Sequence, residues 1–135
     1  MLKIKKQTPV LLKHCVTHLD LLAKENKKTE TCEIYKSCLT QDNTFTPTSF
    51  TLFKLAGWCN EDGNSKEAIQ TYNRLIQLHP EDNLVPKAYF RAAQIFYDRL
   101  MDPPRAKNIL SGLIKKYPDH EIIPHAKNYL KHMTA

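Results

Sequence analysis

Glycine is scarce in this sequence, with three among 135 residues. That number excludes a glycine-rich phosphate loop, a dinucleotide-binding turn and a series of tight β-hairpins. No apolar run approaches the roughly 20 residues that a membrane-spanning helix needs. No two cysteines have Cys-x-x-Cys spacing, which argues against a zinc knuckle or a thioredoxin-type redox motif. These absences direct attention to the helical patterns of the chain.

The length of 135 residues predicts one domain, and 41% hydrophobic with 25% charged residues is ordinary for a soluble globular protein. The formal net charge is +6, distributed as +3 over residues 1–45, −2 over 46–86 and +5 over 87–135. A basic surface attracts acidic peptides, anionic lipid or nucleic acid. Nucleic acid is the least favoured of these partners, because the sequence has no clustered basic motif of a recognised kind.

The four cysteines, Cys15, Cys32, Cys38 and Cys59, all lie within apolar helical patterns. Unpaired thiols favour a reducing compartment, so the sequence predicts a cytoplasmic protein and disfavours the periplasm. The N-terminal residues 1–8 are basic, and the apolar stretch that follows is broken by Lys13, which makes a poor signal peptide. A basic start also fits a tail that follows a membrane helix on the cytosolic face, reached through a segment outside this sequence.

One structural unit occurs three times along the chain, at offsets of 37 and 38 residues. The second and third copies align over Ala68 with Ala106, Tyr72 with Leu110, Leu75 with Leu113, Ile76 with Ile114 and Pro80 with Pro118. The first copy aligns through Thr31, Tyr35, Cys38 and Leu39, with Asn43 in place of the proline. Each copy contains two amphipathic helical stretches. The pattern therefore predicts three helix pairs and, over residues 122–133, a lone closing helix.

Turn and cap residues support these helices. Thr8-Pro9, Thr46-Pro47 and Asp102-Pro103 predict helix starts, and Asn64 with Glu67 resembles a capping box. Pro80 and Pro118 end helices. Within each pair, small residues allow close approach at Ala56 with Ala68 and at Ala93 with Ala106, whereas the first copy has Leu19 and Thr31 there.

At these residues the chain resembles the tetratricopeptide repeat family. The best match is Leu55-Ala56, Gly63, Ala68, Tyr72 and Pro80. The long linkers after Pro80 and Pro118 are similar to those of bacterial outer-membrane assembly lipoproteins and Tol–Pal-associated repeats. The resemblance implies an all-α, right-handed solenoid over residues 9–135. Its repeats would span about 9–45, 46–83 and 84–120, with a closing helix at 121–133.

The resemblance also implies a concave face built from the first helix of each pair. Lys87 and Arg91 match two basic positions of the family's carboxylate clamp, but Val16, Asp20 and Lys54 replace its other members, so we expect no complete clamp. What remains is an expected peptide groove of aromatic, basic and amide side chains, formed by Phe50, Phe53, Lys54, Lys87, Phe90, Arg91, Gln94 and Tyr97.

The sequence predicts a non-catalytic adaptor or scaffold that binds another protein through an acidic, partly apolar peptide. No small-molecule substrate, cofactor, metal or catalytic residue is expected, because no thiol has a positioned base and the pair His14 and His18 has no third ligand at fixed spacing. A regulatory tail of a membrane protein and a nucleic-acid-associated repeat stay as alternatives. Trp58 is expected either to pack against the first copy or to serve as an exposed anchor.

Overall fold

The computed structural model describes residues 9–41 and 46–134, and all regular structure in these ranges is helical. The fold class predicted from the sequence is thereby confirmed. The expected basic segment 1–8 and the aligned position Asn43 lie outside the described residues. The helices are α1 (Pro9–Lys24), α2 (Lys28–Gln41), α3 (Ser49–Glu61), α4 (Ser65–Leu78), α5 (Val85–Asp98), α6 (Pro103–Lys116) and α7 (Ile123–Thr134). None of the described helices is both long and apolar enough to cross a membrane.

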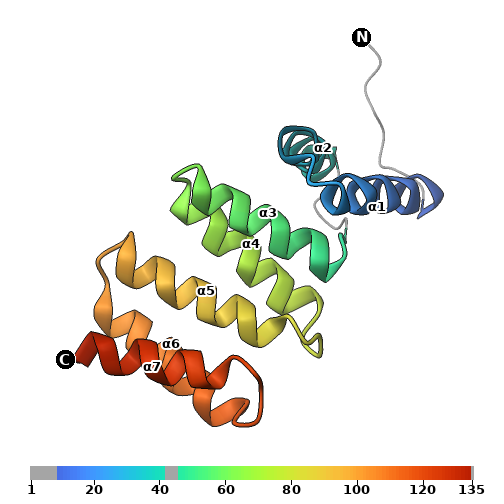
Figure 1. Cartoon of the computed structure of the whole chain (residues 1–135). Coiled ribbons are helices and arrows are strands. Elements are labelled where there is room, and N and C mark those ends of the chain that lie inside the picture. Colours follow the sequence, from blue (N-terminus) through green and yellow to red (C-terminus); the bar gives the residue numbers. More distant parts are fainter. Residues whose placement is uncertain (1–8, 42–45, 135) are drawn as a thin grey trace.

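The helices form antiparallel pairs that follow one another along the chain, α1 with α2, α3 with α4 and α5 with α6, and α7 packs on α6 (Figure 1). The α3–α4 and α5–α6 pairs have the most extensive contacts. Ala56 and Ala68, like Ala93 and Ala106, are fully buried. Alanine at the crossing point lets two helices approach closely, which explains the tight packing of these two pairs.

The first pair departs from this regular packing. Leu19 and Thr31 stand at its small-residue positions, and both are fully buried. These larger side chains hold α1 and α2 further apart than alanine would. In addition, α1 packs against α3 while α2 contacts α3 only lightly, whereas α4 packs extensively against α5. The first pair is therefore turned relative to the second, with α2 lifted away from α4.

The helix start expected at Thr46-Pro47 was wrong. Helix α3 begins at Ser49, and Thr48 rather than Thr46 is its N-cap, with its side-chain oxygen accepting from the Thr51 amide at 3.3 Å. Pro47 is buried before the helix, where its carbonyl oxygen lies 2.8 Å from Nε2 of His79. The cap at Asp102 is confirmed by its bond from the Arg105 amide at 3.3 Å.

The helix start expected at Asn64 is correct, but the capping box expected there is not formed. Asn64 occupies the N-cap position but makes no capping hydrogen bond through its side chain. Helices α4 and α6 end at Leu78 and Lys116, two residues before Pro80 and Pro118, as predicted.

The larger core cluster joins the first two helix pairs and extends along α5 from Val85 to Ile95. Trp58 belongs to it and is 9% exposed, so the expectation of an exposed anchor was wrong and the packed alternative holds. A second cluster joins α5, α6 and α7 around Phe90, Leu110 and Ala126.

Candidate functional site

Two adjoining hollows lie along α3, α5 and α7. The first has a volume of about 380 Å³ and the second about 570 Å³. Arg91, Ile122 and His125 line both, so the hollows form one continuous depression, here called the α3/α5/α7 groove. Its remaining lining residues are Phe53, Lys87 and Glu121 in the first hollow and Phe90, Gln94, Asn128, Tyr129 and His132 in the second.

The floor of the groove is aromatic. Phe53 meets Tyr72 edge-to-face with ring centroids 5.7 Å apart. Phe90 is 7% exposed and packs edge-to-face with Tyr129, with ring centroids 5.9 Å apart, and the Tyr97 ring makes the same kind of contact with Tyr129 at the same distance. Such contacts fix the rings, so the floor is a preformed apolar surface.

The basic side chains of the groove differ in their partners. Lys87 lies 3.0 Å from Glu121, and its hydrogen bond lowers the pKa of that carboxyl group. The Arg91 guanidinium donates to Oε1 of Gln94 at 3.2 Å, is exposed, and forms no ion pair with any described residue. Unlike Lys87, Arg91 can therefore pair with an anionic group of a ligand without first breaking an ion pair.

Five of the eight residues expected in the groove come together there: Phe53, Lys87, Phe90, Arg91 and Gln94. The other three lie outside its lining. The Lys54 ammonium donates to Oδ1 of Asn26 at 2.6 Å and sits 5.3 Å from the Trp58 ring centre, so it turns toward the α1–α2 turn. Phe50 is 39% exposed near the start of α3, and Tyr97 contacts Tyr129 but does not line either hollow.

Sequence reasoning missed the contribution of α7. Ile122, His125, Tyr129 and His132 are spaced by three, four and three residues, which puts them on one face of the helix. The neighbouring stripe of Ile123, Ala126, Leu130 and Met133 is the apolar one, and it belongs to the core cluster around α6. The two stripes are adjacent on the helix. The stripe that faces the groove differs from the core-facing one in containing His125 and His132.

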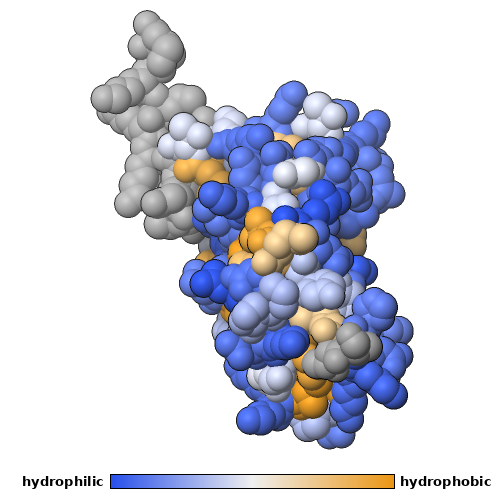
Figure 2. All heavy atoms as spheres, turned by 90° about the vertical axis from the view of Figure 1, so that its left-hand side faces the viewer, coloured by the Kyte–Doolittle hydropathy of each residue, from blue (hydrophilic) through white to orange (hydrophobic). Residues whose placement is uncertain are grey.

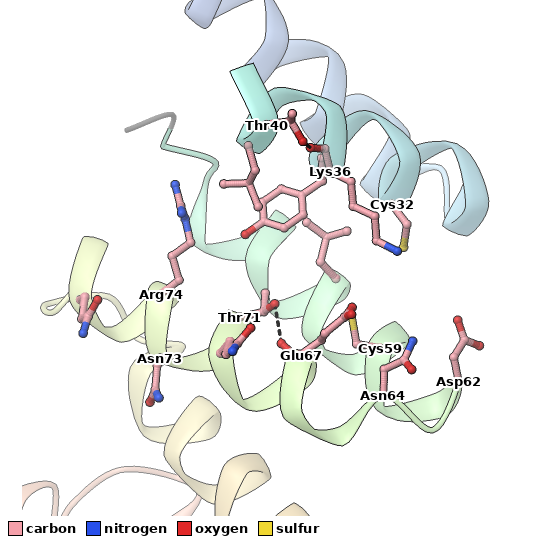
Figure 3. Close-up of a pocket in the computed structure, with 15 residues that line it drawn as sticks. Cys32, Lys36, Thr40, Cys59, Asp62, Asn64, Glu67, Thr71, Asn73 and Arg74 are labelled. Atoms are coloured by element: carbon pink, nitrogen blue, oxygen red, sulfur yellow. Dashed lines mark hydrogen bonds between the residues drawn. The ribbon is translucent and has the colours of Figure 1, made fainter. Parts of the chain in front are cut away.

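A separate and larger hollow of about 840 Å³ lies between α2 and α4 (Figure 3). Lys36 projects into it from α2, while Glu67 and Arg74 project from α4, and Leu55 and Cys59 of α3 also line it. The turned orientation of the first pair opens this hollow. Both signs of charge line it, so it has no single electrostatic preference, and no sequence pattern predicted it.

The described residues contain no group of three or more metal-ligating side chains, and the side chain of His14 lies outside them. Burial raises the pKa of Cys59 to about 11, so this thiol remains protonated at neutral pH. A protonated thiol is a poor nucleophile, and the α3/α5/α7 groove contains no cysteine.

Residues 51–82 and 87–120 each match the model of the tetratricopeptide repeat family. The chain carries tetratricopeptide repeats. The matches fall on the α3–α4 and α5–α6 pairs, the two with alanine contacts. The crystal structure of PcrH from Pseudomonas aeruginosa is similar in fold, with a TM-score of 0.65 and 17% sequence identity over 100% of both chains. No curated protein matches the sequence.

These tetratricopeptide repeats make α3 and α5 the first helices of their units, and α7 occupies the place of a first helix after them. The α3/α5/α7 groove therefore lies on the face built from first helices. The PcrH likeness extends the same fold over the first pair, which the repeat model does not match.

Proposed function

We propose that this protein is a non-catalytic adaptor that binds a protein partner, and that an extended partner segment with acidic and apolar side chains lies in the α3/α5/α7 groove. The observation that supports this most is the continuity of the two hollows through Arg91, Ile122 and His125. A continuous groove accommodates several residues of a chain, whereas separate pits accept single side chains.

The chemistry of the groove favours such a segment. Its aromatic floor offers apolar contact area, and Gln94 and Asn128 can donate to and accept from peptide groups. The net charge of +5 over residues 87–135 attracts an acidic ligand during association. The Lys87–Glu121 pair is partly exposed, so a ligand carboxylate can replace Glu121 at little energetic cost.

One face of the molecule is also suited to an adaptor. Figure 2 shows a face on which hydrophobic side chains are confined to small areas among hydrophilic ones. A surface of this kind disfavours indiscriminate apolar association and leaves recognition to shaped hollows. We place the adaptor in the cytoplasm, where its four cysteines would remain reduced.

The test is affinity capture from a lysate, followed by titration of a peptide from the captured partner. Lys87→Glu with Arg91→Glu should weaken binding about tenfold or more, because two favourable charges become repulsive. The matched control is Lys66→Glu with Lys115→Glu, which changes the same charge at exposed positions outside the groove. Equal affinities for the wild type and the groove variant would show that the partner binds elsewhere.

A further inference from the structure

The linkers that follow α4 and α6 are similar in sequence but differ in chemistry at one position. Asp82 in the first linker and His120 in the second both stand two residues after the proline. Asp82 accepts a hydrogen bond from the Leu84 amide through Oδ1 at 2.8 Å. His120 accepts one from the Ile122 amide through Nδ1 at 3.1 Å. A carboxylate and an imidazole therefore make the same local contact ahead of α5 and α7.

Each of these two side chains also reaches back to the start of the preceding first helix. The second carboxylate oxygen of Asp82 accepts from the hydroxyl group of Ser49, the first residue of α3, over 2.7 Å. Nε2 of His120 lies 3.1 Å from the backbone oxygen of Asn83 and 3.0 Å from its Oδ1, two residues before α5. The Asp82 side chain thus ties α5 to α3, and the His120 side chain ties α7 to α5.

The hydrogen bonds of His120 assign its hydrogens. A backbone amide donates, so Nδ1 presents its lone pair to Ile122. The two oxygens of Asn83 accept, so Nε2 carries the hydrogen. Only the neutral imidazole satisfies both contacts, because the imidazolium carries a hydrogen on each nitrogen and would turn its Nδ1–H against the Ile122 N–H.

Ile122 connects this contact to the α3/α5/α7 groove. Its side chain lines both hollows, and its amide is the group that His120 binds. The residue between them, Glu121, pairs with Lys87 on α5. Three consecutive residues therefore hold the start of α7 against α5 and position the wall of the groove there.

We propose that His120 is a positioning residue of the groove, and that its protonation in mild acid loosens the wall at Ile122 and weakens ligand binding. The effect on binding rests on the proposed function, whereas the effect on the wall does not. Histidine is the side chain whose charge changes between about pH 5 and 8. Protonation turns the acceptor into a donor, so it removes the Ile122 hydrogen bond and leaves two N–H groups facing each other.

Other titratable groups surround this contact. They are Asp119 and Glu121 in the same linker, Asp82 in the α4–α5 linker, Lys87 on α5 and His125 on α7. Glu121 interacts through charge with His120 and His125 as well as with Lys87. An imidazolium at position 120 would compete with Lys87 for the Glu121 carboxylate. It would therefore weaken the second contact of this segment as well as the first.

The bond between Asp82 and Leu84 is a control within the same molecule. Burial raises the pKa of Asp82, but hydrogen bonds from Leu84 and Ser49 outweigh burial and leave the pKa below its usual value. The carboxylate therefore remains an acceptor throughout the range in which histidine changes charge. The amides of Leu84 and Ile122 have the same place in their linkers and differ in whether the acceptor titrates.

The experiment measures amide hydrogen exchange by NMR on the full chain without ligand, at about pH 8 and about pH 5. Comparison with the rate of an unfolded peptide at the same pH gives a protection factor for each amide. Protection of Ile122 should fall roughly three- to tenfold in acid, and protection of Leu84 should not. His120→Asn supplies an acceptor and a donor that do not titrate, so it should remove the fall. His132→Gln, which replaces an exposed histidine elsewhere on α7, should retain it.

A second measurement addresses binding. A peptide from the captured partner is titrated into the wild type and into His120→Asn at both pH values. The two proteins share every other titrating group, and so does the peptide, so the comparison isolates position 120. The wild type should lose roughly three- to tenfold more affinity in acid than His120→Asn.

The two parts of the proposal fail separately. Equal protection of the wild-type Ile122 amide at both pH values, or an equal fall in His120→Asn, overturns the role of His120. The first of these results needs no substitution, so it decides even where a variant does not fold. Equal losses of affinity overturn the effect on binding, provided that Lys87→Glu with Arg91→Glu still weakens it. If that groove variant binds as the wild type does, the proposed function fails instead, and hydrogen exchange still decides the role of His120.

Discussion

Thr48 donates a hydrogen bond to the carboxylate of Asp20 over 3.0 Å and thereby ties the start of α3 to α1. The same carboxylate oxygen accepts from Thr51 at 3.2 Å, and the other oxygen lies 3.2 Å from the Lys24 ammonium. Thr48 is also the N-cap of α3. One carboxylate thus connects the irregular first pair to the second, at the junction where regular repeat packing is weakest.

Asp20 should make stability depend on pH. Burial raises its pKa, but hydrogen bonds from Lys24, Thr48 and Thr51 together outweigh burial and leave the pKa below its usual value. A carboxyl group with a lowered folded-state pKa stabilises the fold above its unfolded pKa of about 3.9, and this stability is lost as pH falls through the folded value. Asp20→Asn should cost roughly 1–2 kcal/mol at pH 7 and much less at pH 3.

Urea unfolding at both pH values measures this difference. Asp119→Asn, at an exposed linker position, is the control and should change stability little at either pH. If Asp20→Asn cost as much at pH 3 as at pH 7, the carboxylate charge would not be the source of the stabilisation.

The residues that repeat in the sequence predicted the regular part of the fold. Ala56, Ala68, Ala93 and Ala106 recur at one position of the unit, and the structure buries all four completely. Pro80 and Pro118 marked the helix ends because proline acts through local geometry. Leu19 and Thr31, which stand where the other copies have alanine, also indicated that the first pair differs from the other two. Such features depend on a single position within the repeat, so they can be recognised from spacing.

Other features depend on pairs of residues that spacing does not connect. Nothing local distinguishes Thr48 from Thr46 as the cap of α3, since the choice follows from Asp20, 28 residues away, and from the bond between Pro47 and His79. Lys54 has the helical spacing of a groove residue, but its ammonium group instead donates a hydrogen bond to Asn26 in the α1–α2 turn. Helix α7 likewise has two adjacent stripes. The one that packs on α6 leaves the other to face the groove, and spacing within α7 does not say which is which.

The alanine contacts should not tolerate larger side chains. Ala68→Leu or Ala106→Leu should destabilise the protein by roughly 1–3 kcal/mol, because each fully buried alanine lies in the contact of a tightly packed pair. Urea midpoints measure the effect. Ser111→Leu, at an exposed position of α6, adds similar bulk without overpacking and should stay close to the wild type. Unchanged midpoints for both alanine variants would contradict the assigned crossing point.

Two glycines should respond to alanine in opposite directions. Gly112 is exposed within α6, and an added Cβ would meet nothing within 4 Å, so Gly112→Ala should stabilise by about 0.5–1 kcal/mol. Gly63 has φ of +83° in the α3–α4 turn, where an L-residue is strained. Gly63→Ala should therefore destabilise by about 1 kcal/mol. Thermal unfolding of both variants tests the pair, and a change of the same sign would refute the argument.

Glu121 should act as a competitor for the acidic ligand of the α3/α5/α7 groove. Its carboxylate lies 3.0 Å from Lys87, so Glu121→Gln frees that ammonium and removes one repulsive charge from the rim. Glu121 is exposed, so screening by solvent limits the gain to a few-fold in affinity. Titration of a peptide from the captured partner at low and high salt measures it, and the gain should shrink with salt because exposed charges are screened.

Glu81→Gln is the matched control for this change. It removes the same charge at an exposed position in the preceding linker, outside the groove. It therefore reproduces any change in affinity that comes only from the higher net charge of the protein. Tighter binding by Glu121→Gln alone would place the ligand's acidic group beside Lys87. Equal gains for the two variants would instead mean that net charge attracts the peptide and that the Lys87–Glu121 pair has no part in its recognition.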